Sequence, residues 1–204
     1  MKIHTTLRDA LSSAKCKLWS SVAGLLMCGV LASGAQAMPV SVSDTQLQTS
    51  NGQLFNFSFG GLPNPGTSGQ YLLTMRGDYS GFNSESAVAS IDIAGGLLDV
   101  GNTANGVISN TIAGLSLASS NRTVFSFDDV RWDFVFNMTD ALLNAAIADT
   151  VFTSRVNLDP GVNNFNNRSF VTVGLRYEAV PEPASLALLG LGLLGLGLSR
   201  RKSA

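Results

Sequence analysis

Three carboxylates within six residues are the first feature of this sequence that could do chemistry. Asp128, Asp129 and Asp133 are close enough along the chain to hold a hard cation such as Ca²⁺ or to act as a general acid and base. No Asp-x-Asp-x-Asp-Gly loop is present, so calcium is not supported and no cofactor or metal is assigned. Glycosidase chemistry needs a second carboxyl group across a cleft, which a single strand face does not provide.

The apolar residues around these carboxylates indicate how they are positioned. Phe125 and Phe127 fall on odd numbers. After the acidic pair, the apolar residues fall on even numbers: Val130, Trp132, Phe134 and Phe136. Because side chains alternate between the two faces of a strand, this one-residue phase change predicts a β-bulge or a tight turn at Asp128-Asp129.

Beyond this break, Asp129, Arg131 and Asp133 share one face of the predicted strand. Neighbours on such a face are about 6.6 Å apart along the strand, so Arg131 can pair with either carboxylate. The simpler alternative to a cation site or a catalytic site is therefore a solvated, salt-bridged face that contributes little energy.

The cysteines and the histidine are confined to the N-terminal end of the chain. His4, Cys16 and Cys28 all lie within the first 37 residues. If that segment is removed, the rest can form no disulfide, Cys/His zinc site, Cys nucleophile or Ser-His-Asp triad. We therefore expect no enzymatic activity. The enzyme alternative, a polysaccharide hydrolase or lyase, needs two carboxylates that converge in a cleft.

Sugar-stacking side chains are few between the two ends of the chain. The candidates are Trp132, Tyr71, Tyr79 and Tyr177. A carbohydrate-binding module needs such a side chain exposed on a sheet face or loop, so exposure of Trp132 would favour this function and burial would disfavour it. The Asn-rich stretch 161–167 predicts an exposed loop that either hydrogen-bonds sugar hydroxyls or serves only as a turn.

The charge of the central region excludes one class of partner. Residues 38–180 contain six arginines, no lysine and twelve acidic residues, for a net charge of −6. Such a balance repels the phosphates of nucleic acids and anionic lipid headgroups. We therefore expect no nucleic-acid partner.

Alternating apolar and polar residues predict strands through most of the central region. The clearest runs are 55–59, 71–75, 89–93 and 171–177. Turn signals rich in Gly, Asn and Pro separate such runs at 60–66, 95–96, 105–106 and 159–161. Residues 140–149 form the exception, because they carry clustered Ala, Leu and Ile after Thr139 or Asp140 as a cap and predict one short helix. The pattern predicts one mainly β domain over residues 38–179, an antiparallel β-sandwich that is jelly-roll-like.

The N-terminus has the three parts of a secretory signal peptide. A basic region is followed by an apolar run at 18–31 and by Ala35-Gln36-Ala37, a small-x-small cleavage site. The basic residues are Lys2, Arg8, Lys15 and Lys17. We expect signal peptidase to remove residues 1–37. The alternative is an amphipathic N-terminal helix or a retained anchor.

The C-terminus combines a proline motif with a short apolar segment. Pro181, Glu182 and Pro183 precede fifteen residues, 184–198, that are only Ala, Ser, Leu and Gly. The basic end follows as Arg200, Arg201 and Lys202. As a helix this segment is about 22 Å long, against about 30 Å of bilayer hydrocarbon, so it can only just span a membrane. The positive-inside rule keeps the basic end in the cytoplasm and the domain outside it.

These three C-terminal features together resemble the PEP-CTERM sorting signal, over residues 180–204. The resemblance implies export and processing at the proline motif by exosortase, a membrane protease-transpeptidase, after transient insertion in the inner membrane. It also implies a final location on the outer surface or in the extracellular matrix, with exopolysaccharide and biofilm as partners. The alternative is an ordinary tail anchor.

The sequence thus predicts an exported structural or adhesive protein of the cell surface. A carbohydrate-binding module for exopolysaccharide is the first alternative, and a polysaccharide-active enzyme is the second.

Overall fold

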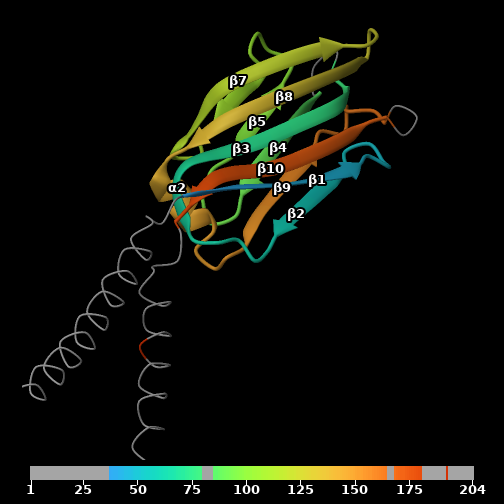
Figure 1. Ribbon diagram of the computed structural model, residues 1–204. Helices are drawn as coiled ribbons and strands as arrows, with labels where there is room; N and C mark the ends of the chain where they lie inside the picture. The colour runs from blue at the N-terminus through green and yellow to red at the C-terminus, as the bar shows by residue number, and fades with distance from the viewer. Residues whose placement is uncertain (1–36, 80–84, 165–167, 181–191, 193–204) are drawn as a thin grey trace, which may run out of the picture. The chain divides into compact units, whose positions relative to one another are not determined.

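The computed structural model of the protein describes residues 37–79, 85–164, 168–180 and 192. One compact unit spans Ala37–Pro181. Its described part contains two five-stranded antiparallel sheets and one short helix (Figure 1). The mainly β class predicted from the sequence is confirmed. Apart from Ala37 and Gly192, the predicted leader and the tail from Pro181 onward lie outside the described residues.

The strands fall into two sheets with distinct membership. Sheet A contains, in spatial order, β1 (Met38–Leu47), β10 (Phe170–Ala179), β3 (Pro65–Asp78), β8 (Asp129–Met138) and β7 (Leu115–Val124). Sheet B contains β2 (Leu54–Phe59), β9 (Phe152–Leu158), β4 (Ser86–Ile91), β5 (Leu98–Gly101) and β6 (Val107–Asn110).

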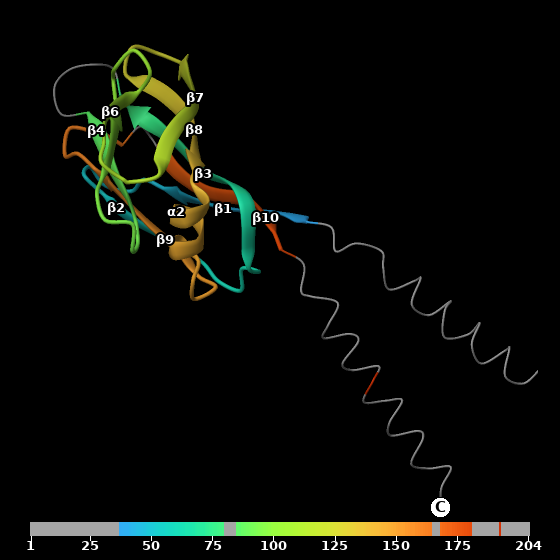
Figure 2. The same cartoon turned by 90° about the vertical axis from the view of Figure 1, so that its left-hand side faces the viewer.

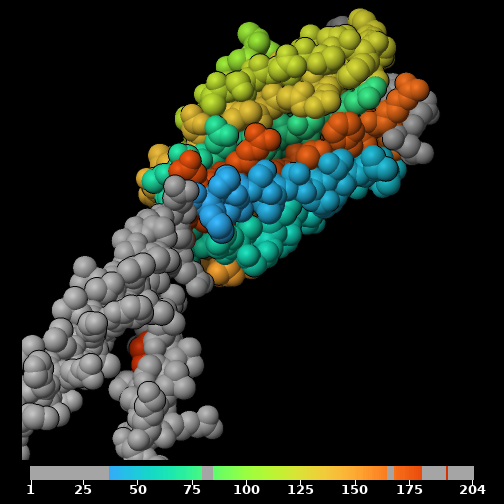
Figure 3. Space-filling view, viewed as in Figure 1, coloured from blue at the N-terminus to red at the C-terminus, as the bar shows by residue number. Residues whose placement is uncertain are grey.

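The two halves of the chain pair with each other in a nested order. Strand β1 pairs with β10, β2 with β9 and β3 with β8, so successive pairs alternate between sheet A and sheet B. The register aligns Met38 with Ala179, which brings both ends of the domain to the same end of sheet A. In the space-filling view β10, in orange-red, runs between blue β1 and green β3 (Figure 3).

Period-two burial explains why these segments form strands. The alternating buried side chains are Val171, Val173, Leu175 and Tyr177 in β10, and Tyr71, Leu73 and Met75 in β3. These side chains join one core with those of sheet B. Figure 2 shows the strands of the two sheets as two layers. The hydroxyl groups of Tyr71 in β3 and Ser154 in β9 are 3.0 Å apart, which links the two sheets through the core.

Stacked aromatic rings form the part of the core along β8. The ring centroids of Trp132 and Phe134 are 5.4 Å apart, and those of Phe134 and Phe136 are 5.8 Å apart. Each fully buried Phe stabilises the fold by about 1.5–3 kcal/mol through the removal of apolar surface from water. Gly106, with φ 79°, lies over this stack, where a Cβ atom would be 2.5 Å from the ring of Phe134.

The predicted helix is present but ends earlier than expected. Helix α2 spans Asp140–Ala146, and the Thr139 hydroxyl caps it by accepting a hydrogen bond from the Leu142 N–H at 3.3 Å. The segment after Ala146 is a turn, because the Thr150 N–H donates to the carbonyl of Ile147 at 2.9 Å. The apolar spacing alone could not reveal this turn.

Two strand boundaries also differ from those predicted by the alternating pattern. Strand β4 ends at Ile91, so Ile93 does not continue it. The Ala94 N–H donates to the Ile91 carbonyl at 3.2 Å and closes a turn there. At the other boundary, Pro65 belongs to β3 and not to the preceding turn, because it pairs with Ala179 of β10.

Candidate functional site

The predicted carboxylate cluster divides into separate ion pairs on the outer face of sheet A. Arg76 of β3 binds Asp129 with two hydrogen bonds, from Nε to Oδ1 at 2.8 Å and from NH2 to Oδ2 at 2.7 Å. This guanidinium holds the pKa of Asp129 below its usual range, chiefly through hydrogen bonding. The guanidinium of Arg76 also lies 4.0 Å from the centroid of the Phe125 ring.

The second carboxylate, Asp133, pairs with Arg131, which is one of the two pairings that the sequence analysis allowed. Arg131 donates to Oδ1 of Asp133 from Nε at 3.0 Å and from NH2 at 2.6 Å. The hydroxyl of Thr74 donates to the same oxygen at 2.8 Å. Of the two pairings left open by the sequence, Arg131 adopts the one with Asp133, because Asp129 is held by Arg76.

Asp128 lies apart from both ion pairs, in the turn between β7 and β8. The Phe125 N–H donates to the Asp129 carbonyl at 2.9 Å, which closes the turn. The phase change in the sequence therefore marks a turn between two strands. Phe125 and Phe127 are exposed there. No group of three or more His, Cys, Asp or Glu residues in the described part of the chain is placed to hold a metal ion.

The aromatic candidates for sugar stacking lie in the core. Trp132 is 2% exposed, and Tyr71, Tyr79 and Tyr177 are buried as well. Burial raises the pKa of Tyr71 to about 12, because the phenolate is poorly solvated there. Stacking of a sugar ring on any of these four side chains would require the core to open.

Amide groups of the Asn-rich loop bind other parts of the protein. The side chain of Asn163 donates to Oδ2 of Asp78 at 2.7 Å and accepts a hydrogen bond from Asn51 at 2.8 Å. Oδ1 of Asn51 in turn accepts the Asn164 N–H at 3.1 Å. These contacts fasten the loop to the end of β3. Residues 165–167 lie outside the described part.

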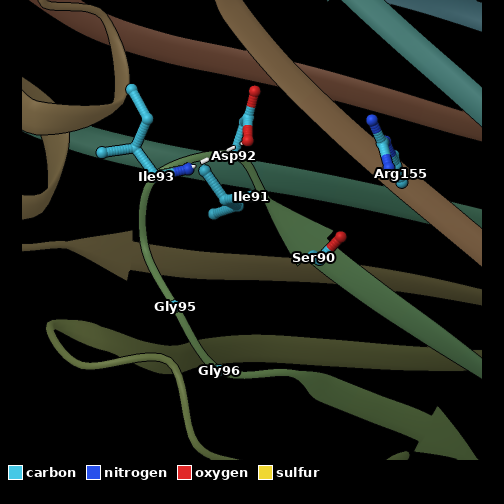
Figure 4. A pocket seen from close by; sticks show the side chains of 7 residues that line it. All are labelled: Ser90, Ile91, Asp92, Ile93, Gly95, Gly96 and Arg155. Atoms are coloured by element: carbon cyan, nitrogen blue, oxygen red, sulfur yellow. Dashed lines mark hydrogen bonds between the residues drawn. The ribbon is translucent and has the colours of Figure 1, made fainter.

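A hollow on sheet B brings together polar residues that the sequence did not group. Its volume is about 220 Å³, and it is lined by Ser90, Ile91, Asp92, Ile93, Gly95, Gly96 and Arg155 (Figure 4). Ser90 of β4 is directly opposite Arg155 of β9 in the antiparallel register. The hollow therefore combines a guanidinium, a carboxylate and a hydroxyl group beside an exposed loop.

The loop beside the hollow has a strained backbone. Ile93 has φ 73°, a left-handed conformation that is unfavourable for a β-branched residue, and its side chain is 65% exposed. Its N–H donates to Oδ1 of Asp92 at 3.2 Å. Gly96 holds the far side of the loop close to the next hairpin, since a Cβ atom there would be 2.5 Å from the Thr111 carbonyl oxygen.

Sequence reasoning missed this hollow because its parts are far apart along the chain. Arg155 joins Ser90 and Asp92 only through the pairing of β9 with β4. The nearest signal in the sequence is Gly95-Gly96, which predicts a turn but does not indicate that Arg155 lies beside it.

The C-terminal tail follows the folded domain directly. Strand β10 ends at Ala179, and the Val180 N–H donates to the Asn64 carbonyl at 3.0 Å. Residues 179–202 match the family model of the PEP-CTERM protein-sorting motif. The C-terminal end of the chain therefore carries a PEP-CTERM protein-sorting motif. This motif implies an exported protein that exosortase sorts towards the cell surface.

The sorting residues themselves cannot be placed in the fold. Pro181, Glu182, Pro183 and the basic end at 200–202 fall within the matched range and outside the described residues. Cleavage after Ala37 and membrane insertion of 184–198 stay predictions. Among the described residues, no helix has the length and apolar character needed to cross a bilayer. A search of the curated proteins finds no match to the chain.

Proposed function

We propose that this PEP-CTERM protein is a structural or adhesive component of the extracellular matrix, without catalytic activity. Signal peptidase removes its leader, and exosortase processes its tail after transient insertion in the inner membrane. The domain then acts at the outer surface beside exopolysaccharide. The observation that carries this proposal is the sorting motif at residues 179–202, which follows the last strand of a compact domain without a linker.

The topology supports an exported β-sandwich of the jelly-roll type. Three nested strand pairs alternate between sheets A and B, which is how a long antiparallel ribbon wraps around one core. Such a fold needs no disulfide or metal at this size, because a domain of roughly 140 residues buries enough surface to be stable by itself.

The outer face of sheet A favours a binding or structural role over catalysis. Asp129 and Asp133 are both paired with arginines, and the hydrogen bonds from Arg76 lower the pKa of Asp129, whereas a general acid at neutral pH requires a raised one. Elsewhere on this face, the hydroxyl groups of Thr45 and Thr172 are 2.7 Å apart across β1 and β10. A polar face with paired charges suits contact with hydrated matrix material.

The burial of Trp132 counts against a module that binds sugars by aromatic stacking. A carbohydrate-binding function therefore has to rest on polar groups, and the hollow on sheet B is where such groups gather.

Substitution of the motif glutamate tests the sorting part of this proposal. We expect the wild-type chain, expressed with a matching exosortase, to lose mass near Pro181 and to reach the outer surface. Glu182→Ala should keep the basic end and stay in the inner membrane. Intact mass and membrane fractionation measure both results.

Glu178→Ala is the matched control, because Glu178 is exposed on β10 just before the matched range. It should be processed like the wild type. If wild type and Glu182→Ala both keep Arg200 and remain membrane-bound, the tail is an ordinary anchor and the matrix function loses its support.

A further inference from the structure

We propose that the hollow on sheet B binds a neutral hexose unit of a polysaccharide, with Arg155 and Asp92 as its hydrogen-bonding groups. This inference rests on the proposed matrix function and deepens it by naming a ligand class and a site. The hollow is built from β4, β9 and the loop that follows β4 (Figure 4).

Arg155 offers hydrogen-bond donors towards the outside of the sheet. It is exposed on the outer face of β9, and in the part of the chain that the structure describes it makes no ion pair. Its neighbours across the strands are Asn56 and Ser90, both uncharged. A guanidinium has five N–H donors in a planar fork, and here they are open to oxygen atoms of a ligand.

Asp92 supplies acceptors on the same side of the hollow. One of its carboxylate oxygens accepts the Ile93 N–H, which orients the group and leaves Oδ2 for a ligand. Adjacent sugar hydroxyls are both donors and acceptors, so a guanidinium and a carboxylate can bind them together. The charges of Asp92 and Arg155 balance each other, so the hollow carries no net charge, which suits a neutral sugar.

The strained residue Ile93 supplies the apolar contact that a sugar ring needs. Its side chain is 65% exposed beside the hollow, although burial normally stabilises isoleucine. A β-branched residue at φ 73° persists only where the surrounding structure imposes it, and such strain concentrates at functional sites. Ile93 lines the hollow, so its exposed side chain adds apolar surface beside Asp92 for the C–H face of a bound ring.

The dimensions of the hollow indicate how much of a polysaccharide it can hold. About 220 Å³ is less than the roughly 300–1,000 Å³ typical of pockets for drug-sized ligands, so one sugar unit is the appropriate size. The outer face of sheet B continues with Asn56, Thr153 and Asn157, which are polar and uncharged. Neighbouring sugar units of the same polymer can lie along this face.

Calorimetric titration of the full-length chain in detergent tests the site. The probes are neutral hexasaccharides of α-glucose, β-glucose, mannose and galactose, with hexagalacturonate as the acidic comparison. We expect at least one neutral hexasaccharide to bind more tightly than hexagalacturonate. Arg155→Gln and Asp92→Asn should each lower that affinity about tenfold, the effect of losing a charged hydrogen bond.

Arg176→Gln is the matched control, because Arg176 is likewise exposed but lies on β10 of sheet A. Its affinity should stay within about twofold of the wild type. Circular dichroism verifies that each variant is folded. The inference is overturned if no neutral probe binds, if hexagalacturonate binds best, or if Arg176→Gln weakens binding as much as Arg155→Gln.

The outcome separates this site from the sorting function. Arg155→Gln should still be processed and reach the surface. A wild-type chain that is sorted normally but binds no neutral hexasaccharide would overturn only the site, whereas a wild-type chain that binds sugar but is not sorted would overturn only the matrix function.

Discussion

Two arginines on the outer face of sheet A and one on the outer face of sheet B lie in opposite surroundings. On sheet A, Arg76 and Arg131 are each held by an aspartate with short hydrogen bonds. On sheet B, Arg155 lies between Asn56 and Ser90 beside a hollow and a strained loop. A paired guanidinium stabilises the fold, whereas an open one is available to a ligand. Although acidic residues outnumber arginines in this domain, only some of the arginines that the structure describes are therefore held in ion pairs.

The largest expected effect is the loss of stability when the more buried ion pair, Arg76–Asp129, is broken. Asp129→Asn should destabilise the domain by about 2 kcal/mol, because it removes charged hydrogen bonds from the largely buried pair with Arg76. Asp133→Asn is the control and should cost about 0.5 kcal/mol, since that pair is more exposed. Urea unfolding measures both. Equal effects of the two substitutions would contradict the ranking of the pairs.

Relief of the strain at Ile93 is expected to have a smaller effect of opposite sign. Ile93→Asn should stabilise the domain by about 1 kcal/mol, because asparagine adopts positive φ more easily and little burial is lost. The same variant should bind the neutral hexasaccharide more weakly. Thermal unfolding measures the expected gain in stability, and calorimetric titration measures the expected loss of sugar affinity. A destabilised variant would show that Ile93 serves the fold and not a ligand.

The smallest expected effect is the loss of stability as the pH is lowered. The pKa of Asp129 is lowered in the folded state, so its contribution to stability is complete above the unfolded value of about 4 and is lost as the pH falls towards the folded value. The loss is smaller than for substitution, since a protonated carboxyl group keeps part of its hydrogen bonding. Unfolding from pH 6 to pH 2.5 should show a shallower decline in Asp129→Asn. If stability declined with pH equally steeply in the wild type and in Asp129→Asn, the decline would not be due to Asp129.

Strand positions could be predicted from the sequence to the extent that they depend on local alternation. The runs around Phe57, Leu73 and Val173 form strands as predicted, because period-two burial is visible in a few consecutive residues. The prediction fails at Ile93 and Pro65. A turn hydrogen bond ends β4 in the first case, and pairing with Ala179 extends β3 in the second.

The candidate site residues were harder to predict, because ion pairs join strands distant in sequence. The spacing of Asp129 and Asp133 predicts a possible cluster, but Arg76 and Thr74 from β3 bind these carboxylates separately. Arg155 gave no signal in the sequence, since its neighbour Ser90 is reached only through the pairing of β9 with β4.

The sequence by itself determined the sorting motif at the C-terminus and the mainly β character of the domain. Both depend on residues that are adjacent along the chain, where composition and spacing carry the information. The tertiary structure alone decided that Trp132 is buried, that Asp129 is neutralised by Arg76 and that Arg155 opens onto a hollow. These outcomes depend on strand register and on which face of a sheet meets the core, and both are set by long-range packing.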